Sequence, residues 1–176
     1  QGIAGSCLAW ELKRRGTDFT ITDRPIAETA SRVAAGLVNP LTGRAFRPGW
    51  RQEECLSAAA DFYPETEREL GGSWWQKTPI FRELETEDQL EIWQERQMAP
   101  ESSAYAGPLF PWPERWEGQG KAAYTRGSAV LHVEDMVNAM RQFFTEQGRF
   151  VEADVSPADI RPDENGLFHW NGQKFS

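Results

Sequence analysis

The sequence predicts an α/β fold that is interrupted by a more helical, tryptophan-rich insert and followed by a small antiparallel β-meander. The chain opens with a glycine turn, an amphipathic helix and a short strand, which together form the first half of a βαβ unit. A helix followed by a strand returns over residues 133–155. Two Asn-Gly pairs near the end of the chain are typical of hairpin turns between short strands.

The first helix and strand are predicted from hydrophobic spacing. Residues 3–15 place four apolar side chains on one helical face, and Gly16 stands where a helix commonly ends. Residues 17–23 then alternate apolar and polar side chains, and Arg24-Pro25 ends the strand. Residues 30–50 are rich in Ala, Gly and Pro and have no sustained period. We expect them to form an irregular loop that passes close to a ligand.

The insert begins with a helix over residues 52–70, where apolar residues recur at helical spacing. Residues 73–84 look extended, and a second helix is expected over residues 85–97 with Thr86 as its N-cap. The stretch 98–118 is rich in proline and aromatic residues, so it is expected to form a loop or a lid.

After the insert, the chain is expected to return to the first domain. Residues 121–133 are predicted to form a strand, residues 133–148 a strongly amphipathic helix, and residues 149–155 the next strand. Three short segments from residue 158 onward make the meander. The expected domains are a discontinuous one over residues 1–50 and 127–176 and an inserted one over residues 51–126.

The charge of the chain argues against nucleic acid as a ligand. Its 176 residues include 19 Lys and Arg against 27 Asp and Glu, a net charge of -8, which does not favour binding to DNA or to an anionic membrane. No long apolar run and no signal peptide is seen, so we expect a cytoplasmic protein. The cysteines and histidines have no metal-ligand spacing, and no metal site is predicted. The sequence does not predict the oligomeric state.

Gly2 and Gly5 have the spacing of the last two glycines of the G-x-G-x-x-G motif, and Asp23 ends the strand that follows. In this motif the glycines let the backbone approach a pyrophosphate, and the helix N-terminus offers free N–H groups. The acid accepts hydrogen bonds from a ribose. The pattern predicts dinucleotide binding rather than an ordinary tight turn. The first glycine and its strand are expected upstream of Gln1.

Four stretches of the chain resemble the D-amino-acid oxidase and glycine oxidase family of FAD-dependent oxidoreductases. They are "GIAGSCLAWELKRRG", "TITDR", "SRVAAGLVNPLTGR" and the segment 127–155. The resemblance implies an incomplete Rossmann-like FAD-binding domain with an inserted α+β substrate domain. It also implies a second FAD-binding half after Ser176, so that the fragment alone would be inactive.

The resemblance implies a set of FAD-binding residues. The Ser-Arg-x-x-Ala-Gly stretch runs under the diphosphate and beside the flavin ring in this family, and the following Asn lies near the ring. The backbone of a valine in the final long strand holds the adenine. The implied residues are Gly2, Ile3, Ala4, Gly5, Asp23, Arg24, Ser31, Arg32, Ala35, Gly36, Asn39 and Val155.

The activity implied by the family is oxidation of a C–N bond of an amine or amino acid by hydride transfer to FAD. Arg44 and Arg47, with Arg51 behind them, could bind a substrate carboxylate, and Arg126 could face the substrate; none is predicted to be catalytic. A set of aromatic residues could line the pocket or form core and domain interface. These are Trp74, Trp75, Phe81, Phe110, Trp112 and Trp116.

Within the family, "NPLTGRAF" with the following "GW" most resembles the FAD domain of the bifunctional enzyme that modifies the wobble uridine of transfer RNA. Three other functions stay open at this point. One is a dinucleotide-binding module without redox activity, and another is an NAD-dependent dehydrogenase, for which the Ser31–Gly43 loop would have no role. A structural or carbohydrate-binding protein is disfavoured by the α/β start of the chain.

Overall fold

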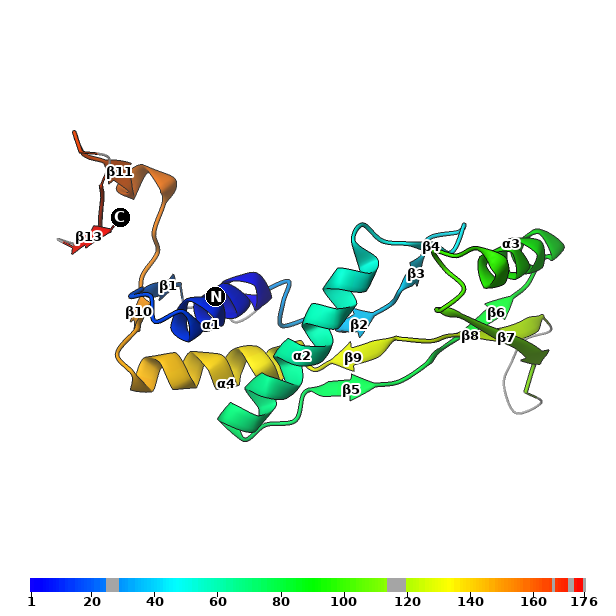
Figure 1. Ribbon diagram of the computed structural model, residues 1–176. Helices are drawn as coiled ribbons and strands as arrows, with labels where there is room; N and C mark the ends of the chain where they lie inside the picture. The colour runs from blue at the N-terminus through cyan, green and yellow to red at the C-terminus, as the bar shows by residue number, and fades with distance from the viewer. Residues whose placement is uncertain (25–28, 114–119, 166, 171–172, 176) are drawn as a thin grey trace. The chain divides into compact units, whose positions relative to one another are not determined.

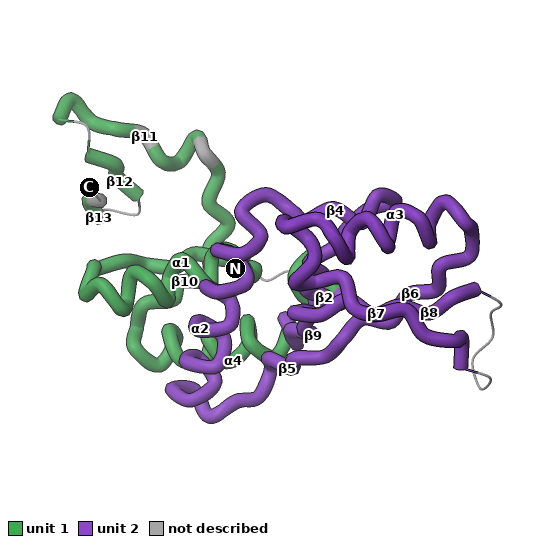
Figure 2. The backbone as a smooth tube through the Cα atoms, turned by 45° about the vertical axis from the view of Figure 1, so that its right-hand side comes forward, with its two compact units in different colours: residues 1–34, 134–176 green, residues 35–133 purple. Residues whose placement is uncertain are grey.

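The computed structural model describes residues 1–24, 29–113, 120–165, 167–170 and 173–175 (Figure 1). The chain forms two compact units (Figure 2). Unit 1 contains residues 1–34 and 134–176, and unit 2 contains residues 35–133. Residues 35–50 and 127–133 therefore belong to the same compact unit as the insert. The expected division into functional domains stays a prediction.

Unit 1 contains the predicted half of the βαβ pattern. Helix α1 (Ile3–Arg14) leads through Gly16, whose φ of 65° is left-handed, into strand β1 (Ile21–Asp23). Helix α4 (Val133–Glu146) leads into strand β10 (Phe150–Glu152), which pairs in parallel with β1. The parallel pairing of two strands that each follow a helix confirms the predicted α/β arrangement.

The core of unit 1 is aromatic. Trp10 of α1 is fully buried beside Phe143 and Phe144 of α4, with ring centroids 5.4 and 6.2 Å away. Phe19 adds a further edge-to-face contact to Phe144 at 5.4 Å. Rings of this size bury large apolar areas, so these residues hold α1 against α4.

The predicted meander is present at the end of unit 1. A short 3-10 turn (Pro157–Asp159) precedes strands β11 (Arg161–Pro162), β12 (Phe168–Trp170) and β13 (Gln173–Phe175). The three strands pair antiparallel in sequence order. The predicted turns at Asn165-Gly166 and Asn171-Gly172 lie in part outside the described residues.

Both helices predicted in the insert are present in unit 2. Helix α2 (Gln52–Leu70) has the predicted bounds and ends at Gly71, whose φ is 70°. Helix α3 (Glu87–Met98) begins with the predicted Thr86 cap, and the side chain of Gln89 completes a capping box.

Three antiparallel sheets accompany these helices. One has the strand order β6 (Ile80–Leu84), β8 (Lys121–Thr125) and β7 (Ala106–Pro111). A second has the order β2 (Leu37–Val38), β9 (Ala129–Leu131) and β5 (Trp75–Lys77). The third pairs β3 (Leu41–Thr42) with β4 (Arg47–Pro48).

Two predictions for strands in unit 2 were wrong. The single strand expected over residues 121–133 is divided into β8 and β9, because Gly127 turns the chain with a φ of 71° and sends the halves to different sheets. The stretch 98–118, expected to be a loop, contains β7. Its pairing with β8 shifts between Ala106 and Leu109, which lets the edge strand accommodate Pro108.

The core of unit 2 lies between α3 and the β6-β8-β7 sheet. Trp93 of α3 is fully buried, and its Nε1–H donates to the Gly107 carbonyl at 3.0 Å. Leu84 and Ala123 pack with it from the sheet, and Phe46 contacts its ring edge-to-face at 5.3 Å. Phe46 therefore ties the β3-β4 hairpin to this core.

Candidate functional sites

The N-terminus of α1 presents unpaired backbone N–H groups. Gly2 is the N-cap and has no side chain to cap the helix, while the Ile3 amide donates to Ser31 Oγ at 3.0 Å. The exposed amides of Ala4 and Gly5 have no acceptor among the described residues. An α-helix leaves these first amides free and carries a partial positive charge there. This end of α1 can therefore bind an anion.

Glycine at position 2 is explained by the closeness of Ser31. A Cβ at Gly2 would lie 2.6 Å from Ser31 Oγ, so a side chain there would displace the hydroxyl from the helix end. The space around Gly5 is open, with no described atom within 4 Å of an added Cβ. The contact with Ser31 thus requires glycine at position 2, whereas no described contact requires it at position 5.

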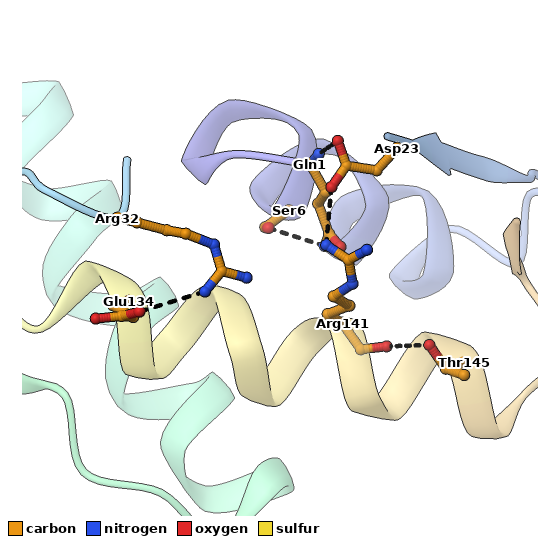
Figure 3. Close-up of polar contacts among 7 residues, drawn as sticks. All are labelled: Gln1, Ser6, Asp23, Arg32, Glu134, Arg141 and Thr145. Atoms are coloured by element: carbon orange, nitrogen blue, oxygen red, sulfur yellow. Dashed lines mark hydrogen bonds and ion pairs between the residues drawn. The ribbon is translucent and has the colours of Figure 1, made fainter. Parts of the chain in front are cut away.

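Asp23 lies at the end of β1 and is largely buried, with 17% of its side chain exposed. Its carboxylate contacts the Gln1 amino group and accepts from Arg141 Nη1 at 2.8 Å (Figure 3). Burial alone would raise the pKa of Asp23, whereas the charge of Arg141 and its hydrogen bond lower it. The carboxylate stays ionised and retains acceptor capacity on its two oxygens.

Two further cofactor candidates carry charged side chains that are paired. Arg32 Nη1 lies 3.3 Å from Glu134 Oε1 at the start of α4 (Figure 3). Arg24 lies 3.9 Å from Asp154 in an exposed pair. Val155 lies beyond the end of β10 rather than within a strand. Of these later candidates, Ser31 is the one that directly contacts the N-terminal end of α1 among the described residues.

The donor set of this site fits the charged part of FAD. Free amides at a helix N-terminus, the Ser31 hydroxyl and the Arg32 guanidinium suit a diphosphate, since all of them donate hydrogen bonds. An ionised Asp23 suits a ribose, because a carboxylate accepts from hydroxyl groups. Residues Gly2–Gly5, Asp23 and Ser31–Arg32 all belong to unit 1.

The other predicted cofactor residues, Ala35, Gly36 and Asn39, belong to unit 2. Gly36 has a φ of 64°, and a Cβ there would lie 1.8 Å from the Leu131 carbonyl oxygen. Asn39 Oδ1 accepts from the Leu41 amide at 3.2 Å, which forms a local turn. The backbone geometry of unit 2 by itself explains the glycine at position 36.

The predicted substrate candidates Arg44 and Arg47 are exposed on the β3-β4 hairpin, and neither has an ion-pair partner in the described part of the chain. The hairpin is anchored by Phe46, a buried residue with a left-handed φ of 47°. Arg82 stacks over Phe46 and donates to the Leu41 carbonyl. Arg51 differs from its neighbours because it pairs with Glu54.

Arg126, the third substrate candidate, lines a cavity of about 590 Å³ in unit 2. Its Nη2 donates to the carbonyls of Ala106 and Ser103 at 2.8 and 3.3 Å, which orients the guanidinium. The sequence did not indicate three other polar residues of this cavity, Glu53, Lys77 and Tyr105. The helical spacing of the residues from Glu53 to Ala60 and the alternation of Trp75 and Lys77 could have grouped some of them.

The predicted aromatic set does not form one pocket. Trp74 is buried and donates to Thr66 Oγ1 at 3.2 Å, so it belongs to the core. Trp75 stacks on Tyr63 at 5.0 Å and lines the cavity. Phe81 and Phe110 contact each other at 6.0 Å on the β6-β8-β7 sheet. Trp116 lies outside the described residues.

The fold of unit 1 and the free end of α1 are those of the α/β class whose members bind dinucleotides at a helix N-terminus. A model of the DAO family, described as FAD dependent oxidoreductase, matches residues 1–169. The chain belongs to this family of FAD-dependent oxidoreductases, as its sequence motifs predicted, and the cofactor of the family is FAD.

A solved structure supports the same fold. The crystal structure of glycine oxidase from Geobacillus kaustophilus is similar with a TM-score of 0.70 at 16% sequence identity. The match covers 99% of this chain and 50% of that chain, so the present chain spans half the length of the oxidase. A search of curated proteins finds no significant match. Among the described residues, no helix has the length and apolar character needed to cross a membrane.

Proposed function

We propose that this chain carries FAD-binding residues of an oxidoreductase that oxidises a C–N bond of an amine or amino acid. The observation that carries the proposal is the end of α1, where free amides lie beside Ser31, with Asp23 at the end of β1. Membership of the FAD-dependent family supports flavin over a nicotinamide cofactor. Bound FAD would accept a hydride from the carbon next to the substrate amine.

Each predicted residue receives a role toward FAD in this proposal. The amides of the Gly2–Gly5 turn and the Ser31 hydroxyl bind the diphosphate, with Arg32 neutralising its charge. Asp23 accepts hydrogen bonds from the ribose, with Arg24 beside it. The assignments that rest on the family resemblance alone are Ala35, Gly36 and Asn39 near the flavin ring and Val155 at the adenine.

We infer that the substrate is a small molecule with a carboxylate. The exposed Arg44 and Arg47 can each donate paired hydrogen bonds to such a group, and the oriented Arg126 can donate single hydrogen bonds to it. The structural neighbour, a glycine oxidase, supports an amino acid as the substrate. We also assign residues 1–50 and 127–176 to the FAD-binding domain, residues 51–126 to the substrate domain, and the protein to the cytoplasm.

Flavin binding tests this function directly. The purified full-length protein should show the absorption bands of bound flavin, and Asp23→Ala should weaken FAD binding by about tenfold or more, since a charge-assisted hydrogen bond is lost. Asp18→Ala is the matched control because Asp18 is fully exposed and pairs with Arg149. A full-length protein that binds no added FAD would refute the proposal.

Redox chemistry is tested separately from binding. Amines and amino acids are added to the flavin-loaded protein without oxygen, and bleaching of the flavin band reports hydride transfer. Flavin that stays oxidised with every amine and amino acid would instead favour a dinucleotide-binding module without redox activity.

A further inference from the structure

The cavity of unit 2 is built from two regular surfaces and a turn. Helix α2 contributes Glu53, Leu56, Ser57 and Ala60, which share one face because they are three or four residues apart. Strand β5 contributes Trp75 and Lys77, which point to the same side because they alternate. Tyr105 and the turn 126–128 complete the wall. Its volume of about 590 Å³ is typical of small-molecule sites.

The turn holds its charged residue in a fixed position. The Arg126 amide donates to the Tyr105 carbonyl at 2.8 Å, and Gly127 has a left-handed backbone whose added Cβ would lie 3.3 Å from the Tyr105 ring. Two carbonyls occupy Arg126 Nη2. The Nε and Nη1 donors have no acceptor among the described residues, so they are available to a ligand.

Charges of both signs line this cavity. Lys77 and Arg126 are cationic, and Glu53 supplies the acid. Burial, and next the negative charge of Glu53, raise the pKa of Tyr105. Lys77 has no ion-pair partner among the described residues. A ligand with one positive and one negative group can therefore pair with both kinds of side chain.

The remaining wall is apolar and partly rigid. The ring of Trp75 is stacked on Tyr63, with the planes 28° apart. Tyr63 in turn contacts Phe62 at 5.3 Å on α2. Leu56, Ala60 and Pro79 add aliphatic surface. A ring held in place by stacking offers a flat surface for a planar group at low entropic cost.

We propose that this cavity binds the substrate as a zwitterion with a bulky planar group. Its carboxylate pairs with Lys77 and Arg126, its ammonium group pairs with Glu53, and its planar group lies against Trp75. The inference rests on the proposed function and deepens it, because it names the substrate class as amino acids with a large aromatic or similar substituent rather than glycine itself.

Four related probes separate the three interactions. N-benzylglycine carries all three groups, 4-phenylbutanoate lacks the amine, N-benzylethylamine lacks the carboxylate, and glycine lacks the ring. Titration calorimetry with FAD-saturated protein should give the tightest binding for N-benzylglycine. Each of the other probes should bind about tenfold or more weakly, since each loses a charged pair or the apolar contact.

Variants place the binding in this cavity. Lys77→Gln should weaken the binding of N-benzylglycine and 4-phenylbutanoate but not that of N-benzylethylamine. Glu53→Gln should weaken the binding of N-benzylglycine and N-benzylethylamine but not that of 4-phenylbutanoate. Ala60→Trp should abolish binding by filling the cavity. Lys121→Gln and Ala58→Trp are matched controls, because these residues are exposed and do not line it.

The proposal is overturned if N-benzylglycine binds no more tightly than glycine, or if Lys77→Gln and Ala60→Trp leave its affinity unchanged. Folding of each variant is checked by its circular dichroism and unfolding midpoint. The titrations are repeated without added FAD. If the unsubstituted protein binds FAD but not N-benzylglycine, the cavity assignment alone is refuted, whereas absence of flavin binding would refute the cofactor proposal.

Discussion

The charged candidate residues of the two units differ in their ion pairing. In unit 1 the charges pair with each other: Asp23 with Arg141 at 2.8 Å and Arg32 with Glu134 at 3.3 Å. In unit 2, Arg44, Arg47 and Lys77 have no ion-pair partner among the described residues. Paired charges fix local geometry before a ligand arrives, whereas unpaired cations remain available to bind one. The comparison supports a preorganised cofactor site in unit 1 and substrate recognition in unit 2.

The largest expected effect comes from removing the central ring of either core. Phe144→Ala in unit 1 and Trp93→Ala in unit 2 should each lower the free energy of unfolding by about 3–5 kcal/mol, because both side chains are fully buried. Hydrogen exchange should show the greater loss of protection within the unit that carries the substitution. An equal loss of protection in both units would mean that the two units unfold together.

Left-handed glycines give the next largest contrast. Gly36→Ala in unit 2 should cost about 3–4 kcal/mol, since strain at positive φ adds to a clash with the Leu131 carbonyl. Gly16→Ala at the end of α1 should cost only about 1–2 kcal/mol, because nothing described lies within 4 Å of its added Cβ. Urea unfolding of both variants measures the difference, and equal losses would contradict the packing argument.

Ser31→Ala sharpens the assignment of the cofactor site to unit 1. It should lower the free energy of unfolding by about 1 kcal/mol, because the Ile3 amide loses its acceptor, and it should also weaken FAD binding. Ser102→Ala is the matched variant in unit 2, where the buried hydroxyl donates to the Arg96 carbonyl at 2.8 Å. It should cost a similar amount in stability without changing flavin affinity. Flavin titration of the two variants decides the point.

The smallest expected effect concerns the meander of unit 1. Hydrogen bonds from His169 and from the amides of Asn165 and Leu167 hold the pKa of Asp163 below its usual 3.8. The stabilisation is therefore complete above pH 3.8 and is lost as pH falls through the lowered pKa. Asp163→Asn should remove this dependence, which amide exchange of β11 and β12 would detect. An unchanged acid profile would show that the carboxylate contributes nothing.

Regular hydrophobic spacing and glycines at the ends of helices made much of this fold predictable. Local signals predicted the bounds of α2 and the Thr86 cap. They also predicted that a helix is followed by a strand in both segments of unit 1. Strand β7 was missed because Pro108 and Pro111 are typical of loops, and only its edge position and bulge make them acceptable in a strand.

The two sites differ in how far the sequence could reveal them. The end of α1 was predictable because Gly2 and Gly5 lie in one turn of one element. The cavity was not, since Glu53, Lys77 and Tyr105 come from separate elements that only the folded chain brings together. Arg126 was predicted from its place after the insert, without any indication of the two carbonyls that orient it.

The two ends of unit 2 lie side by side. Leu37 pairs with Val130 across β2 and β9, and the Leu131 amide donates to the Gly36 carbonyl at 2.8 Å. The chain thus leaves unit 2 one hydrogen bond away from where it began, after about a hundred intervening residues. Such a segment can be cut from a gene as a single cassette, replaced by a short linker, or exchanged for the matching segment of a relative. Because the two ends meet, one continuous stretch of coding sequence carries the whole of unit 2.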